Sequence, residues 1–109
     1  VAKMYDEGLK HILVTPYVQN NATHVYHLYV IRVIYRENVR KVLAERGIAT
    51  GIHYPIPLPF LKAYRYMGHK AEDFPVAFSL KDEIFSLPIH GDMTDEQVGE
   101  AITQYEHEL

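Results

Sequence analysis

The sequence predicts a small α+β domain, in which a three-stranded, mainly antiparallel sheet is covered by three to four helices. Two observations predict this class. Short segments of strand character alternate with amphipathic helical segments, and glycine or proline stands at most of the boundaries between them. A third observation sets the size, because 109 residues with 48% apolar content suit one domain with one core.

The predicted elements follow one another along the chain, and the strongest of them is a strand over residues 24–35. Both alternating faces of that strand are largely apolar or aromatic, which predicts a central strand covered on both sides. Thr94 and Gln97 have the spacing of a capping box at the start of the last helix. The other predicted elements are a helix end over residues 1–10, a loop over 11–23, a helix over 37–46, a strand over 48–53, a short helix over 58–66, a helix over 75–84 and a strand over 85–87.

Composition narrows the classes of function. A net charge of −3 and a pI near 6.1 argue against a surface for nucleic acid or acidic membranes. The chain has no cysteine, so it offers no disulfide framework and no thiolate metal site, which suits a cytoplasmic protein. No apolar run has the length of a membrane span. Because the chain opens in the end of an amphipathic helix and without methionine, we expect it to be a piece of a longer protein.

The run Thr50-Gly51-Ile52-His53-Tyr54-Pro55-Ile56-Pro57 is the main candidate site. Each proline fixes its own φ and restrains the residue before it, so this turn holds His53 and Tyr54 at a defined place. Such a turn presents two hydrogen-bonding side chains to a ligand. The structural alternative is that His53 and Tyr54 only end the strand and pack on Tyr64.

Other chemistries find less support. The seven histidines lack metal-type spacing, so no metal site is predicted. A Ser86, His53 and Asp92 set can be assembled, but Ser86 before Leu87-Pro88 is more typical of a turn residue at a strand end than of a nucleophile. A modest basic cluster near the His53–Tyr54 turn is either a solvated face or an attraction for an anionic ligand such as a diphosphate; its members are Lys62, Arg65 and Lys70.

Six sequence blocks cover nearly the whole chain, at residues 27–33, 46–57, 63–65, 73–77, 86–90 and 93–98. The pair G-I-H-Y-P-x-P and D-F-P…S-L-P-x-H is the specific part. In this order and spacing, the blocks resemble the C-terminal small domain of the DegT/DnrJ/StrS-type nucleotide-sugar aminotransferases. One departure is Pro59-Phe60-Leu61, where many members have His followed by Leu-Gln; no role is carried onto Pro59, and the sugar accepted is left open.

The resemblance implies the C-terminal domain of the type I fold of enzymes that use pyridoxal 5′-phosphate (PLP). These enzymes move an amino group, usually from glutamate, onto a keto-sugar carried on a nucleotide diphosphate, and relatives act as homodimers. Residues 1–10 would then lead from a large domain that holds PLP and its Schiff-base lysine, and residues 11–109 would form the small domain. None of the lysines lies in a Schiff-base context, so we expect the chain alone to be inactive and to bind no cofactor. The matching His53 and Tyr54 would bind the sugar or the diphosphate.

Three alternatives stay open. A PLP-dependent sugar dehydratase of the same fold differs in having histidine in place of the Schiff-base lysine, which this chain cannot reveal. A stand-alone small-ligand or regulatory module would fold and bind by itself. A pure interaction domain would leave sugar kinetics unchanged when His53 or Tyr54 is replaced.

Overall fold

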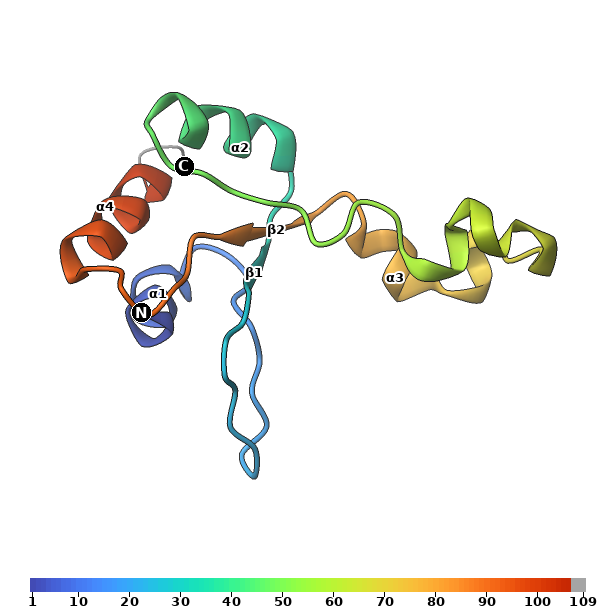
Figure 1. Ribbon diagram of the computed structural model, residues 1–109, viewed down its shortest axis with the longest axis horizontal. Coiled ribbons are helices and arrows are strands. Elements are labelled where there is room, and N and C mark those ends of the chain that lie inside the picture. The colour runs from blue at the N-terminus through green and yellow to red at the C-terminus, as the bar shows by residue number, and fades with distance from the viewer. Residues whose placement is uncertain (107–109) are drawn as a thin grey trace.

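The computed structural model describes residues 1–106, and three helices form its body around a two-stranded sheet (Figure 1). The last three residues of the predicted 11–109 domain, His107 among them, lie outside the described residues. The helices of the body are α1 (Ala2–Leu9), α2 (Arg36–Glu45) and α4 (Asp95–Glu106). They bury one core on the sheet, whose fully buried members include Tyr5, Leu9, Tyr29, Ile31, Leu43, Phe85 and Val98.

The sheet pairs β1 (Tyr29–Arg32) with β2 (Ile84–Leu87) in antiparallel register, with Tyr29 opposite Leu87 and Arg32 opposite Ile84. The predicted third strand over residues 48–53 is absent. Gly51 forms a single bridge to Ser86 on the free edge of β2, and its neighbours leave the edge on either side. The prediction of three strands is therefore wrong in number, because one residue pair does not make a strand.

β1 is also shorter than the predicted strand over residues 24–35. Residues 24–28 have no pairing partner, and Tyr26 has a left-handed φ of 53° with its N–H donating to Nδ1 of His24 at 2.7 Å. At the other end Tyr35 has a φ of 34°. The two faces of β1 differ as well: Tyr29 and Ile31 are buried, whereas Arg32 is exposed, so the expected cover on both faces is wrong.

The helices follow their local signals. Gly47, with a φ of 83°, ends α2 in the left-handed conformation that glycine adopts without strain. The Ile48 N–H then donates to the Leu43 carbonyl at 2.8 Å, as in a Schellman motif. At the start of α4 both capping-box bonds are present: Gln97 N–H donates to Thr94 Oγ1 at 3.1 Å, and Thr94 N–H donates to Gln97 Oε1 at 3.0 Å.

Two segments project from the body (Figure 1). Residues 14–28 form a thin loop that extends past β1, tied to the sheet by the Val14–Arg32 bridge. Residues 54–80, here called the lobe, extend in another direction and contain α3 (Pro75–Leu80). The predicted short helix over 58–66 appears in the lobe as 3₁₀ turns over Leu58–Phe60 and Lys62–Met67, followed by another over Ala71–Asp73. The predicted helix over 75–84 ends early, because Ile84 belongs to β2.

Candidate functional site

His53 lies where the chain leaves the body for the lobe, and its imidazole is within hydrogen-bond distance of β2. Gly51 exchanges both backbone hydrogen bonds with Ser86, since Ser86 N–H donates to the Gly51 carbonyl at 2.7 Å and Gly51 N–H donates to the Ser86 carbonyl at 3.2 Å. Two residues later, Nδ1 of His53 lies 2.9 Å from Oγ of the same Ser86. The imidazole is thus anchored to a sheet residue that is 33 positions away along the chain.

Gly51 gives the imidazole its room. A Cβ atom at position 51 would lie 2.9 Å from Cε1 of His53, which is closer than side chains approach one another. The ring therefore rests against the Gly51 backbone, and any larger residue at position 51 would push it aside.

The hollow beside His53 is small, and its lining contains no Lys, Arg, Asp or Glu. It measures about 230 Å³ and is lined from several segments, by His27, Leu28, Ala49, Thr50, Gly51, His53, Ser86, Leu87, Pro88 and Ile89. Its polar side chains can donate to or accept from the oxygens of a polar ligand.

Tyr54 lies next to His53 but lines a different hollow. Its ring meets the imidazole edge-on, with centroids 5.4 Å apart, and the residue is 72% exposed. The peptide bond between the two residues is cis. The hollow on the Tyr54 side measures about 560 Å³ and is almost wholly apolar; its lining is Tyr54, Pro55, Ile56, Pro57, Leu58, Leu61, Ala77, Leu80, Lys81 and Ile84. The two predicted site residues thus stand between a polar and an apolar hollow.

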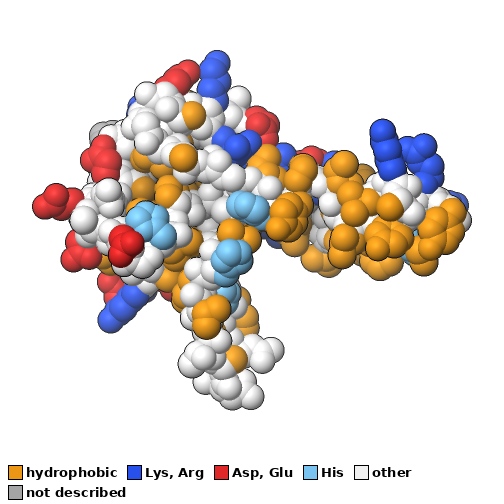
Figure 2. Space-filling model, in the orientation of Figure 1, with side chains coloured by type: hydrophobic (Ala, Val, Ile, Leu, Met, Phe, Trp, Pro, Cys, Tyr) orange, Lys and Arg blue, Asp and Glu red, His pale blue; other side chains and the backbone are white. Residues whose placement is uncertain are grey.

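The predicted basic cluster lies at the other end of the lobe. Lys62, Arg65 and Lys70 are the Lys and Arg residues of the lobe, and all three are exposed. Figure 2 shows basic side chains gathered over the outer end of the lobe, whereas the His53–Tyr54 turn is at its base. The expected proximity of this cluster to the turn is therefore wrong, because the 3₁₀ turns carry residues 62–70 outward.

Ser86 lies inside β2, within the predicted strand over 85–87, and only 5% of its surface is exposed. The alternative interpretation, a turn residue at the strand end, is wrong because Ser86 is paired on both edges of β2. The structure does bring Ser86 and His53 together, but not as a nucleophile and its base. Within residues 1–106, no carboxylate hydrogen-bonds to His53, and the backbone N–H of Asp92 instead donates to Nδ1 of His90 at 3.3 Å. Sequence reasoning named Ser86 and His53 together only in the catalytic set that it set aside, and it did not predict a hydrogen bond between them, since no local signal links positions 53 and 86.

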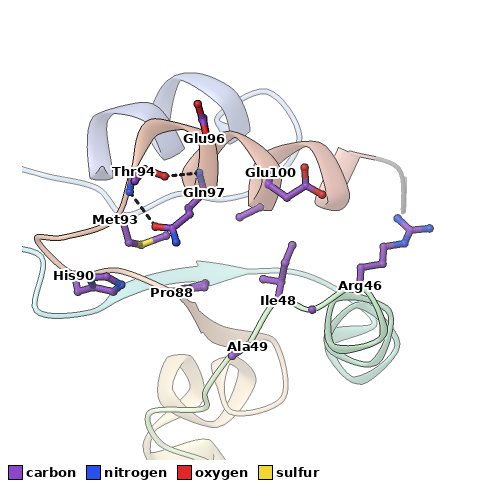
Figure 3. A pocket seen from close by; sticks show the side chains of 12 residues that line it. Arg46, Ile48, Ala49, Pro88, His90, Met93, Thr94, Glu96, Gln97 and Glu100 are labelled. Atoms are coloured by element: carbon purple, nitrogen blue, oxygen red, sulfur yellow. Dashed lines mark hydrogen bonds between the residues drawn. The ribbon is translucent and has the colours of Figure 1, made fainter.

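A third hollow, of about 600 Å³, lies between α4 and residues 46–49 (Figure 3). Thr94 and Gln97 line one side, joined by their capping bonds, and Ile48 points toward them from the other side. No predicted site residue lines this hollow. Within residues 1–106, no group of three or more His, Asp or Glu side chains is arranged to hold a metal ion. None of the helices in that range combines the length and apolar character needed to cross a membrane.

Neither hollow at the His53–Tyr54 turn contains what a PLP Schiff base requires. That chemistry needs a lysine amine with an acid for the pyridine nitrogen. The His53 hollow has neither a lysine nor a carboxylate in its lining. The Tyr54 hollow has Lys81 but no carboxylate in its lining, and Nζ of Lys81 is paired with Asp82 at 2.8 Å and lies 5.1 Å from the Phe78 ring centre. The residues at this turn therefore do not fit the cofactor.

Comparison with known proteins identifies the family. The family model described as the DegT/DnrJ/EryC1/StrS aminotransferase family matches residues 1–105. The chain is 39% identical to dTDP-3-amino-3,6-dideoxy-alpha-D-galactopyranose transaminase of Aneurinibacillus thermoaerophilus over an alignment 109 positions long, which covers 96% of this chain and 30% of that protein.

Solved structures agree with that match. DesV of S. venezuelae, in complex with a ketimine intermediate, superposes with a TM-score of 0.92 at 29% identity, over 97% of this chain and 29% of DesV. The sugar aminotransferase Spr1654 of Streptococcus pneumoniae, in its PMP form, gives a TM-score of 0.82 at 28% identity, over 96% of this chain and 28% of that one.

The chain thus spans less than a third of the length of these relatives. The family is PLP-dependent, and its members include nucleotide-sugar aminotransferases such as the Aneurinibacillus enzyme. With a family model that matches all but four of the 109 residues, the chain belongs to the DegT/DnrJ/EryC1/StrS aminotransferase family.

Proposed function

We propose that this chain is the C-terminal small domain of a PLP-dependent aminotransferase that moves an amino group from glutamate onto a nucleotide-linked keto-sugar. The observation that carries the proposal is the family match over residues 1–105. The name of the Aneurinibacillus relative supports the class of substrate, since it describes a transaminase of a dTDP-linked amino sugar.

In this proposal the chain supplies one wall of the substrate cleft. His53 and Tyr54 hydrogen-bond to the sugar or to the diphosphate and fix the keto carbon for reaction. Their geometry supports this role: His53 is anchored through Nδ1, and Tyr54 projects with most of its surface exposed. PLP and its Schiff-base lysine belong to a large domain outside this chain, which agrees with the lack of a lysine and acid pair at the turn.

The same proposal places residues 1–10 as the helix that leads from that large domain and residues 11–109 as the small domain. The whole enzyme is a homodimer in this proposal. The net charge of −3 argues against nucleic acid as a partner.

The test uses the full-length protein with glutamate and a nucleotide-diphosphate keto-sugar. His53→Ala and Tyr54→Phe should each lower kcat/KM for the sugar nucleotide by about tenfold or more, because each removes a hydrogen bond to a polar or charged ligand. The half-reaction with glutamate, followed by the cofactor spectrum, should stay unchanged. The matched controls are His11→Ala and Tyr66→Phe, since both residues are exposed and lie away from the turn.

The product identifies the reaction. An amino sugar supports the proposal, whereas a deoxygenated sugar without a new amine would replace it by the dehydratase reaction. Unchanged sugar kinetics in both site variants would leave the aminotransferase in place and remove His53 and Tyr54 from its cleft. Cooperative folding of the isolated chain together with ligand binding would favour a stand-alone module.

A further inference from the structure

We infer that Ser86 is the positioning residue of His53: its buried hydroxyl donates to Nδ1, so that His53 keeps its proton on Nε2 and presents an N–H donor to the ligand. The ligand in this inference rests on the proposed function. The proton position does not, because it follows from the contacts of Ser86 alone.

The first step is that the Ser86 hydroxyl has a fixed place. Ser86 stands opposite Val30 of β1 on one side, and on the other side it exchanges both backbone hydrogen bonds with Gly51. With only 5% of its surface exposed, the residue is held from both edges of β2 and has little access to water. Its Oγ atom is therefore a rigid reference point for any side chain that reaches it.

The second step is the direction of the hydrogen bond. A buried hydroxyl needs an acceptor for its proton, because a buried donor that is left unpaired destabilises the fold. Within residues 1–106, Nδ1 of His53 is the partner of Ser86 Oγ, at 2.9 Å. If Nδ1 carried the proton, it would donate to Oγ and the hydroxyl proton would lose its acceptor. The neutral ring therefore accepts at Nδ1 and carries its proton on Nε2.

The third step is that the ring is enclosed on more than one side. The Gly51 backbone lies against Cε1, because a Cβ there would approach it to 2.9 Å. The Tyr54 ring meets it edge-on at 5.4 Å between centroids. The imidazole thus has a set orientation as well as a set tautomer. Gly51 and Ser86 together define both.

The consequence is a preference among ligand atoms. An Nε2–H donor matches a hydroxyl or phosphate oxygen that accepts, and it is a poor partner for a group that can only donate. The polar lining of the adjacent hollow, which contains no Lys, Arg, Asp or Glu, suits the sugar portion of a substrate as well as its polar link to the nucleotide. Ser86 lines the same hollow, but on this view its hydroxyl is engaged by His53 and acts on the substrate through that residue.

The experiment reads the tautomer directly in the full-length protein. Histidine is labelled with ¹⁵N, and long-range ¹H–¹⁵N correlations distinguish a protonated from an unprotonated ring nitrogen; the His53 signals among the seven histidines are those lost in His53→Ala. The expected result in the unsubstituted protein is an unprotonated Nδ1 and a protonated Nε2. A protonated Nδ1 in the neutral ring would overturn the inference, and this measurement needs no Ser86 variant.

Variants then separate positioning from fold. Ser86→Ala should turn the single tautomer into a mixture and lower kcat/KM for the sugar nucleotide several-fold, while Ser86→Thr, which keeps the hydroxyl, should restore the single tautomer. Ser79→Ala is the matched control, because its hydroxyl donates to the Val76 carbonyl in an exposed part of α3. A tautomer unchanged by Ser86→Ala would refute the positioning role.

The two proposals fail in different ways. If Ser86→Ala changes the tautomer and no His53 variant changes the sugar kinetics, the positioning stands and the cleft role of His53 falls. In the double variant with His53→Ala, the loss from Ser86→Ala should disappear, since a residue that acts only through His53 has no further effect once His53 is gone.

Discussion

At the scale of single residues, Tyr5 shows how burial links the core to pH. Its ring is fully buried, its hydroxyl donates to the Pro88 carbonyl at 2.7 Å, and burial raises the pKa of Tyr5 to about 12 from an ordinary value of 10.0. In the unfolded chain the phenol ionises near its ordinary pKa, so above about pH 10 the unfolded state releases a proton that the folded state keeps. The free energy of unfolding should therefore fall as the pH rises from about 10 toward 12.

Tyr5→Phe tests that account. The variant should lose about 1 kcal/mol at neutral pH, because the Pro88 carbonyl loses its donor, and its stability should decline less steeply at alkaline pH. A residual decline remains, since burial also raises the pKa of Tyr29 and of Tyr105. Urea denaturation followed by circular dichroism at several pH values measures both effects. Tyr66→Phe, at an 83% exposed position, is the control, and an alkaline slope in Tyr5→Phe equal to that of the parent would contradict the prediction.

At the scale of elements, α4 depends on its capping box. Thr94→Ala removes the acceptor for the Gln97 N–H at the first turn and should lower the free energy of unfolding by about 1 kcal/mol. Thr103→Ala, at an exposed position inside the same helix, should instead change stability little or raise it slightly, because alanine is the better helix former. Thermal or urea denaturation compares the two, and equal effects would show that the cap contributes nothing measurable.

The contact between α1 and α4 gives a second test through two helical glycines. A Cβ at Gly99 would meet nothing within 4 Å, so Gly99→Ala should stabilise the chain by roughly 0.5–1 kcal/mol. A Cβ at Gly8 would lie 2.8 Å from Cδ1 of Ile102, so Gly8→Ala should gain less than Gly99→Ala or lose stability. Denaturation midpoints of the two variants measure the difference. A larger gain at Gly8 would mean that α1 does not pack closely on α4.

The elements also show what the sequence was able to predict. α4 and the end of α2 were predicted well because their signals are local: a capping box, an apolar stripe and Gly47 all act within a few residues. The number of strands was predicted wrongly, because strand pairing depends on residues that are far apart in the sequence. The 48–53 segment pairs with β2 at Gly51 alone. The candidate site shows the same contrast between local signals and contacts that are distant in the sequence. The proline turn marked His53 and Tyr54, whereas the hydrogen bond between His53 and Ser86 was evident only in the fold.

At the scale of the whole molecule, the chain is more extended than a compact domain of its length. Its radius of gyration is 15.5 Å, compared with about 13 Å expected for this size. The excess comes from the 14–28 loop and the lobe, which project from the body (Figure 1). Figure 2 shows hydrophobic side chains along the lobe. The exposed apolar residues of the lobe include Tyr54, Ile56, Leu58, Met67, Val76 and Phe78. A surface of this kind is typical of an interface that another domain covers.

In the proposed function, the domain that covers this surface is the large PLP-binding domain. The isolated chain should therefore behave unlike the whole enzyme. Expressed alone, the 109 residues should bind a hydrophobic dye and self-associate, as measured by fluorescence and sedimentation velocity. Val76→Asp, at a lobe position that is 69% exposed, should reduce both in the isolated chain and should destabilise the whole enzyme, where the same surface is buried. Ile34→Asp is the matched control, because Ile34 is 71% exposed on the body and outside the lobe. A monomeric isolated chain that binds no dye would contradict a covered lobe. Equal destabilisation of the whole enzyme by Val76→Asp and Ile34→Asp would also contradict a covered lobe, since a charge is costly only where the surface is removed from water.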